Sequence, residues 1–115
     1  MSRHDDRISM RQMLDHARRG CAMAHGRKRE DLDSDYTFQL ALTRLVEIMG
    51  EAASRVSMPT REKHPEIPWS DIVGMRNRLI HGYDVVDLNL LWDTVSSDLP
   101  PLIEALAAAQ KGTTQ

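Results

Sequence analysis

Pro68-Trp69-Ser70-Asp71-Ile72-Val73-Gly74-Met75-Arg76-Asn77-Arg78-Leu79-Ile80-His81-Gly82-Tyr83 is the segment around which the sequence is organised. A single helical face is indicated because apolar groups recur every three or four residues, at Trp69, Ile72, Val73, the Arg76 stem, Leu79 and Ile80. A glycine in the position of Gly82 suits the left-handed residue that ends a helix. We therefore expect His81 in the last turn of this helix and Tyr83 just beyond its end.

This placement would put an amide, a guanidinium and an imidazole near the end of the helix. Asn77 lies four residues before His81, so on a helix the amide would neighbour the imidazole and could fix its orientation. Arg76 lies five residues before His81, about 140° around the axis, from which a long side chain still reaches a phosphate over the helix end. Because the negative end of the helix dipole favours a protonated imidazole, the two residues would form a small cationic site suited to a phosphodiester.

The composition predicts one helical domain. The chain has 115 residues, of which 41% are hydrophobic and only 4% aromatic, which favours helices packed through aliphatic side chains. A formal net charge of −2 creates no global attraction for nucleic acid, so any RNA binding must come from a local patch. The single cysteine, Cys21, excludes an intrachain disulfide and a cysteine-based zinc site. With no signal-like segment and no run of transmembrane length, we expect a cytoplasmic protein.

Two long helices are predicted before this segment. The first runs from about Asp5 to Ala24, and a charged connector, residues 26–31, follows it; its basic triplet is a solvated loop or, alternatively, an RNA contact. The second begins near Ser34 or Asp35 and ends at Met58-Pro59. It is apolar on two sides, so it should contact more than one neighbour, one of which could be another subunit. Gly50 costs the helix interior about 1 kcal/mol relative to alanine and permits close approach of another backbone.

The remaining segments complete a bundle. A short helical turn is expected at residues 60–64, an extended link at residues 65–68, and a last helix capped by Asp87. Pro100-Pro101 should kink or break that helix, since an interior proline costs roughly 3 kcal/mol. We expect residues 111–115 to form a disordered tail. The prediction is a single all-α domain over residues 1–115, an up-and-down antiparallel bundle of about four main helices.

The sequence resembles the HepT-like toxins of the HEPN superfamily, a group of prokaryotic ribonucleases. The resemblance rests on the motif formed by Arg76, four residues, His81, one residue and Tyr83. Four flanking segments also resemble the family in order and spacing: residues 47–53, 64–69, 74–77 and 98–100. Together they cover most of residues 47–102.

The resemblance implies an HEPN-like bundle that cuts RNA without a metal or another cofactor and works as a homodimer whose paired motifs face one cleft. It also implies a partner, a minimal nucleotidyltransferase antitoxin that forms a hetero-oligomer with the toxin and silences it by attaching AMP to the motif tyrosine. Carried onto this chain, Arg76 and His81 are catalytic, Asn77 is supporting, and Tyr83 is the modification site. Arg78 is a further candidate for contacting RNA.

The chemistry of the motif agrees with these roles. Metal-free cleavage of RNA needs a base, an acid and positive charge on the phosphorane, and one histidine cannot easily act as base and acid in the same step. Two subunits would supply two copies of His81 and of Arg76 to one cleft. Structural alternatives remain open: the arginine could pair with a carboxylate, the histidine could cap a carbonyl, and Tyr83 could be a packing residue. The chain could then be a non-catalytic bundle that docks the transferase, or a structural dimer.

Overall fold

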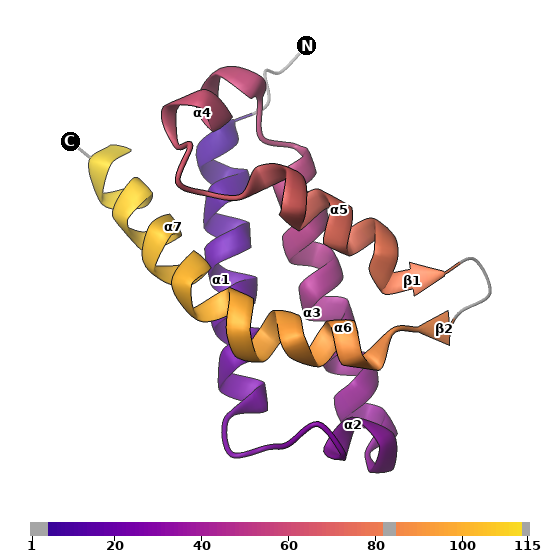
Figure 1. The fold of residues 1–115 in the computed structure, drawn as a ribbon. Coiled ribbons are helices and arrows are strands. Elements are labelled where there is room, and N and C mark those ends of the chain that lie inside the picture. The colour runs from indigo at the N-terminus through magenta and orange to yellow at the C-terminus, as the bar shows by residue number, and fades with distance from the viewer. Residues whose placement is uncertain (1–4, 82–84, 114–115) are drawn as a thin grey trace.

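The computed structural model describes residues 5–81 and 85–113. In chain order the elements are α1 (Asp6–Ala24), α2 (Asp31–Ser34), α3 (Tyr36–Ser54), α4 (Met58–Lys63), α5 (Trp69–Leu79), β1 (Ile80–His81), β2 (Val85–Val86), α6 (Leu88–Asp93), the π-helical segment η1 (Thr94–Asp98) and α7 (Leu99–Thr113) (Figure 1). Within these residues the fold is helical apart from the two-residue pairing of β1 with β2. The predicted all-α bundle is confirmed.

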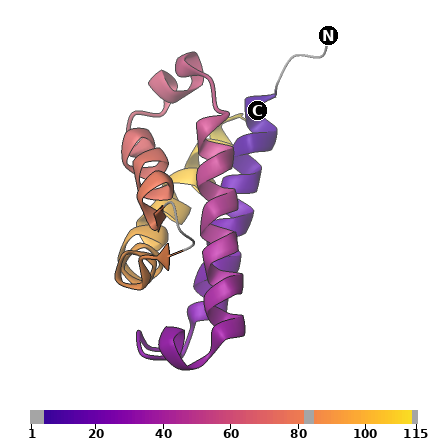
Figure 2. The same cartoon turned by 90° about the vertical axis from the view of Figure 1, so that its right-hand side faces the viewer.

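The antiparallel pair α1 and α3 forms one layer of the bundle, and α5, α6 and α7 cover one side of it (Figure 2). Both long helices begin within two residues of the predicted positions, and an aspartate caps each of them. The Asp5 carboxylate accepts the Arg7 backbone N–H, and the Asp35 carboxylate accepts the backbone N–H of Phe38. The core between the layers is aliphatic, and its completely or almost completely buried side chains include Met13, Leu32, Leu42, Val46, Met49, Leu79, Leu91, Leu99 and Leu106.

The connection from α3 to α5 is held by side chains that cap the end of α3. α3 stops at Ser54, and Met58-Pro59, expected to end this helix, begins α4 instead, where a proline needs no N–H. Arg61 donates from Nε to the Val56 carbonyl (3.0 Å) and lies over the Trp69 ring, 5.8 Å from its centre. The predicted short helix is therefore present, but residues 65–68 form a turn and not the predicted extended link, since the Ile67 N–H donates to the His64 carbonyl at 3.1 Å.

The last helix is divided, as expected, but the irregular turn precedes Pro100-Pro101. Asp87 caps α6 by accepting the Leu90 N–H at 3.0 Å. In η1 the Leu99 N–H donates to the carbonyl of Thr94, five residues earlier. Pro100 and Pro101 have no N–H, and their rings would clash with the carbonyls four residues before them, so a wider turn relieves the conflict. Both prolines then lie exposed in the first turn of α7, where the missing N–H groups are tolerated.

The end of α7 differs from expectation. The helix continues to Thr113, so residues 111–113 do not form the predicted disordered tail, while residues 114 and 115 lie outside the described part of the chain. The preceding run Ala105-Leu106-Ala107-Ala108-Ala109 has high helix propensity and anchors this end through buried Leu106 and Ala109. No helix of the described residues is long and apolar enough to cross a membrane.

Candidate active site

The helix that carries the motif ends earlier than its sequence predicts. α5 stops at Leu79, whose carbonyl accepts the Asp87 backbone N–H at 2.9 Å, and the main chain of His81 continues in β1, opposite Val85 of β2. β-branched residues at 80, 85 and 86 favour this extended pairing over another helical turn. The prediction that His81 occupies the last turn of the helix is therefore wrong. Gly82 and Tyr83, expected just at and beyond the helix end, lie outside the described residues.

The earlier helix end changes how the motif residues relate to one another. Because His81 is no longer helical, Asn77 and His81 are not i, i+4 neighbours on one helix face, and the proposed fixing of the imidazole by this amide loses its geometric basis. Asn77 is exposed on α5, as is Arg78. Arg76 and Arg78 share the last turn of α5, where the helix dipole favours cations.

Arg76 is half-buried, and its stem crosses α3 at Gly50 (α5 lies beside α3 in Figure 2). A Cβ atom added to Gly50 would lie 2.6 Å from Cβ of Arg76 and 3.0 Å from its Cγ. The glycine in α3 was expected to admit another backbone, but it admits the side chain of Arg76. The sequence shows that a glycine lies inside a long helix, but only the structure shows that Arg76 packs against it.

The Arg76 guanidinium has no ion-pair or hydrogen-bond partner among the residues that the structure describes. The predicted structural role of Arg76, pairing with a carboxylate, is therefore not seen within them. By contrast, two arginines of the basic triplet at residues 27–29 are engaged. Arg27 pairs with Asp35 at 3.2 Å and stacks on Phe38, and Arg29 pairs with Asp33 at 3.0 Å. Their contacts fit a structural connector better than a site for RNA.

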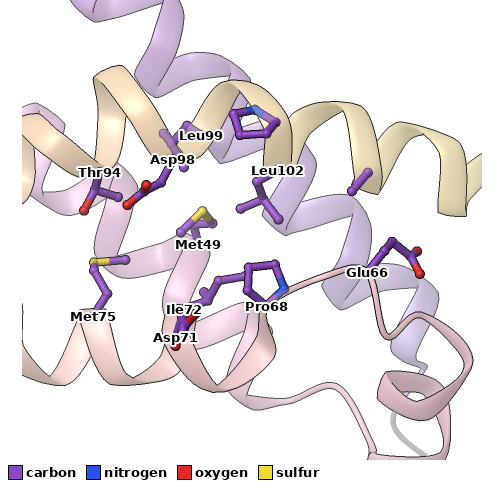
Figure 3. A pocket seen from close by; sticks show the side chains of 12 residues that line it. Met49, Glu66, Pro68, Asp71, Ile72, Met75, Thr94, Asp98, Leu99 and Leu102 are labelled. Atoms are coloured by element: carbon purple, nitrogen blue, oxygen red, sulfur yellow. The ribbon is translucent and has the colours of Figure 1, made fainter.

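A cavity of about 340 Å³ lies between α5, η1, α7 and the link before α5 (Figure 3). Its apolar lining includes Met49, Ile72 and Leu102. The charged groups that line it are all carboxylates, those of Glu66, Asp71 and Asp98. Figure 3 shows Asp98 and Glu66 toward opposite ends of this space. Three carboxylates repel a phosphodiester, so the cavity is unsuited to RNA, and the cationic end of α5 is the better candidate site.

Cys21 is not a competing nucleophile. Its thiol faces the carbonyl of Val95 at 3.9 Å, and partial burial raises its pKa. A raised pKa keeps the sulfur protonated near neutral pH, whereas nucleophilic cysteines need a thiolate. The chemistry of this chain is therefore better sought at Arg76 and His81.

The fold and the site together define an all-α bundle with two arginines in the last turn of one helix and a histidine two residues beyond the end of that helix. Comparison with known proteins agrees: the chain belongs to the ribonuclease HepT-like family, whose model matches residues 13–109. It is 44% identical over 73 residues to the "Probable ribonuclease HepT" of Thermococcus cleftensis, covering 64% of this chain and 66% of the relative.

Two further relatives have similar descriptions. One is the "Putative RNase TTE0752" of Caldanaerobacter subterraneus subsp. tengcongensis, 40% identical over 64% of this chain and 65% of its own. The other is the "Putative RNase MJ1380" of Methanocaldococcus jannaschii, 45% identical over 54% of this chain and 57% of its own. The matches thus span between 57% and 66% of the length of these curated relatives. No solved structure matches the chain significantly.

Proposed function

We propose that this protein is a metal-independent endoribonuclease whose site is built from Arg76 and His81. The observation that carries the proposal is the half-buried Arg76 in the basic last turn of α5, five residues before His81, with no ion pair to any residue that the structure describes. An arginine whose stem is held against its own subunit is positioned to bind an anion, and its planar fork matches the oxygens of a phosphodiester. Membership of the ribonuclease HepT-like family supports RNA as the substrate.

The proposed reaction is an internal transfer at phosphorus. A base, His81 in its neutral form, removes the proton of the 2′-hydroxyl, and the 2′-oxygen attacks the adjacent phosphorus. Arg76 stabilises the additional negative charge of the phosphorane. An acid then protonates the departing 5′-oxygen, so that the products are a 2′,3′-cyclic phosphate and a 5′-hydroxyl. The cycle needs one group to accept a proton while another donates one.

A homodimer would supply both proton-transfer groups. One subunit contributes a single His81, and a symmetric partner would bring the second imidazole and a second guanidinium to the same cleft. The exposed apolar residues of α3 support a protein interface on this helix. Tyr36 and Leu40 are 67% and 51% exposed in the single chain and lie four residues apart on this helix, where a partner could cover both.

The physiological role we propose is that of a toxin in a toxin–antitoxin pair, silenced by a minimal nucleotidyltransferase. The transferase would join the Tyr83 hydroxyl oxygen to the α-phosphate of ATP and release pyrophosphate. The new phosphodiester would bring negative charge and a bulky nucleoside close in sequence to Arg76 and His81, which would compete with RNA. The resemblance of the motif to HepT-like toxins supports this role, and Arg78, exposed in the same turn as Arg76, is proposed to contact RNA.

The test is cleavage of RNA by the purified, unmodified protein in the presence of EDTA. We expect fragments ending in 2′,3′-cyclic phosphate, at a rate that EDTA does not change. Complete inhibition by EDTA that added metal reverses would contradict the metal-independent mechanism. A folded protein that binds the transferase but never cleaves RNA would favour the alternative, a non-catalytic bundle that docks this partner.

A further inference from the structure

Gly50 occupies a place in α3 where the backbone itself does not require glycine. It lies well inside the helix Tyr36–Ser54 and has an ordinary helical backbone. Among the described glycines only Gly26 has a positive φ, of 76°. An alanine would be a better helix former at such a position. The reason for glycine must therefore be sought in what lies beside it.

The neighbour is the stem of Arg76, along three successive carbons. A Cβ atom at Gly50 would lie 2.6, 3.0 and 3.4 Å from Cβ, Cγ and Cδ of Arg76. The first distance is shorter than real Cβ contacts allow, so either α5 would move away from α3 or the arginine would leave its present rotamer. The helical glycines Gly74 and Gly112 differ, since a Cβ there would meet no atom within 4 Å.

We infer that Gly50 is a positioning residue: it opens a notch in α3 in which the Arg76 stem lies, so that the guanidinium is directed to the substrate before RNA binds. The inference rests on the proposed function of Arg76. The Arg76 stem packs along three carbons against α3 at Gly50, and this packing limits the directions that the guanidinium can take. An arginine whose stem is already ordered need not reorient as negative charge develops on the phosphorane.

If Gly50 has this role, replacing it should lower kcat although both proposed catalytic side chains are still present. Gly50→Ala leaves Arg76 and His81 in place but displaces the guanidinium by a fraction of an ångström or more. Displacement on the scale of 1 Å can reduce a rate by about 100-fold, because charge stabilisation depends on geometry in the transition state. An interaction made chiefly in the transition state changes kcat rather than KM.

The first experiment compares Gly50→Ala with Gly74→Ala, a glycine-to-alanine control in the helix that carries Arg76. For each we would measure kcat and KM with RNA, the melting temperature and the oligomeric state. We expect Gly50→Ala to fold, to lose about 100-fold in kcat and to change KM less than threefold. Gly74→Ala should keep the wild-type kcat. A folded Gly50→Ala protein with wild-type kcat would overturn the inference.

A second experiment separates this inference from the proposed function, because it needs no RNA. Arg76→Gly removes the stem that fills the notch, so Gly50→Ala should lower the melting temperature when Arg76 is present and should not lower it in the Arg76→Gly background. Equal shifts in the two backgrounds would overturn the packing role, even if RNA is cleaved. If Gly50→Ala alone fails to fold, the double variant Gly50→Ala, Arg76→Gly decides the question. A folded double variant supports packing of the Arg76 stem in the notch, and an unfolded one overturns it. A wild-type protein without RNA cleavage would refute the proposed function, while these melting temperatures would still decide the contact.

Discussion

Replacing Arg76 by alanine should separate a catalytic role from a structural one. The substitution removes the guanidinium and every stem carbon beyond Cβ. Within the described residues it breaks no ion pair, and the lost packing is that of a half-buried stem against Gly50. At about 0.8 kcal/mol for each fully buried methylene, two half-buried ones are worth roughly 1 kcal/mol of unfolding free energy. For a domain of this size that corresponds to a melting temperature lower by about 5 °C.

The expected loss of activity is much larger than this loss of stability. Removing one group that stabilises developing charge typically lowers kcat by about 100- to 1,000-fold, or roughly 2.7–4 kcal/mol of transition-state stabilisation. The assay is steady-state cleavage of a defined RNA together with thermal melting of the same preparation. Arg19→Ala is the matched control, since it removes the same charge from the exposed surface of α1, where Arg19 pairs with Asp15 at 3.0 Å.

Two results would refute this reasoning. One is a folded Arg76→Ala protein whose kcat stays within threefold of that of Arg19→Ala. The other is a destabilisation above about 3 kcal/mol, the size expected when a buried ion pair is broken. Either would mean that Arg76 supports the fold rather than the chemistry.

Three further predictions concern assembly, control and acid stability. Light scattering should show a homodimer, and a stable monomer that still cleaves RNA would contradict the shared site. Incubation with ATP and the partner nucleotidyltransferase should add one or more AMP groups at Tyr83 and stop cleavage; Tyr83→Phe should escape the modification, and peptide mapping that places AMP elsewhere would reject this site. The Phe38 backbone N–H, and then Arg27, lower the pKa of the Asp35 carboxyl, so its stabilising contribution is present above its ordinary pKa of about 4 and is lost as the pH falls through the lower folded value. Asp35→Asn should therefore make the melting temperature less dependent on pH in this acid range, and an unchanged slope would argue against the carboxylate cap.

The helices were predictable from sequence wherever local interactions determine them. Asp5, Asp35 and Asp87 each accept a backbone N–H at the start of a helix. The caps at Asp35 and Asp87 were predictable as acidic residues before apolar-periodic segments, whereas Asp5 was expected as the first residue of its helix. The broken last helix was also predictable, because a pair of prolines cannot continue a regular helix without conflict. The position of the break was not, since the π-helical turn forms upstream, where the chain can widen.

The features that the sequence did not predict depend on distant residues. α5 ends at Leu79 because the returning chain supplies the Asp87 N–H and a strand partner, and helical periodicity up to Ile80 contains no sign of this competition. The contact of Gly50 with Arg76 joins residues 26 positions apart, which no local pattern specifies. The contacts of the basic connector were equally unpredictable, because Arg27 stacks on Phe38 of α3 and Arg29 donates to Asn89 of α6.

The most direct test of the ribonuclease site is the cleavage rate of His81→Ala relative to wild type, measured on folded protein. His81 is the proposed proton-transfer group, and it follows α5 in the only segment of the chain that combines an arginine, a histidine and a tyrosine within eight residues. The account predicts a loss of at least 100-fold in kcat with helicity unchanged by circular dichroism, because proton transfer contributes about 100- to 10,000-fold. A folded His81→Ala protein that cleaves RNA at the wild-type rate would contradict it.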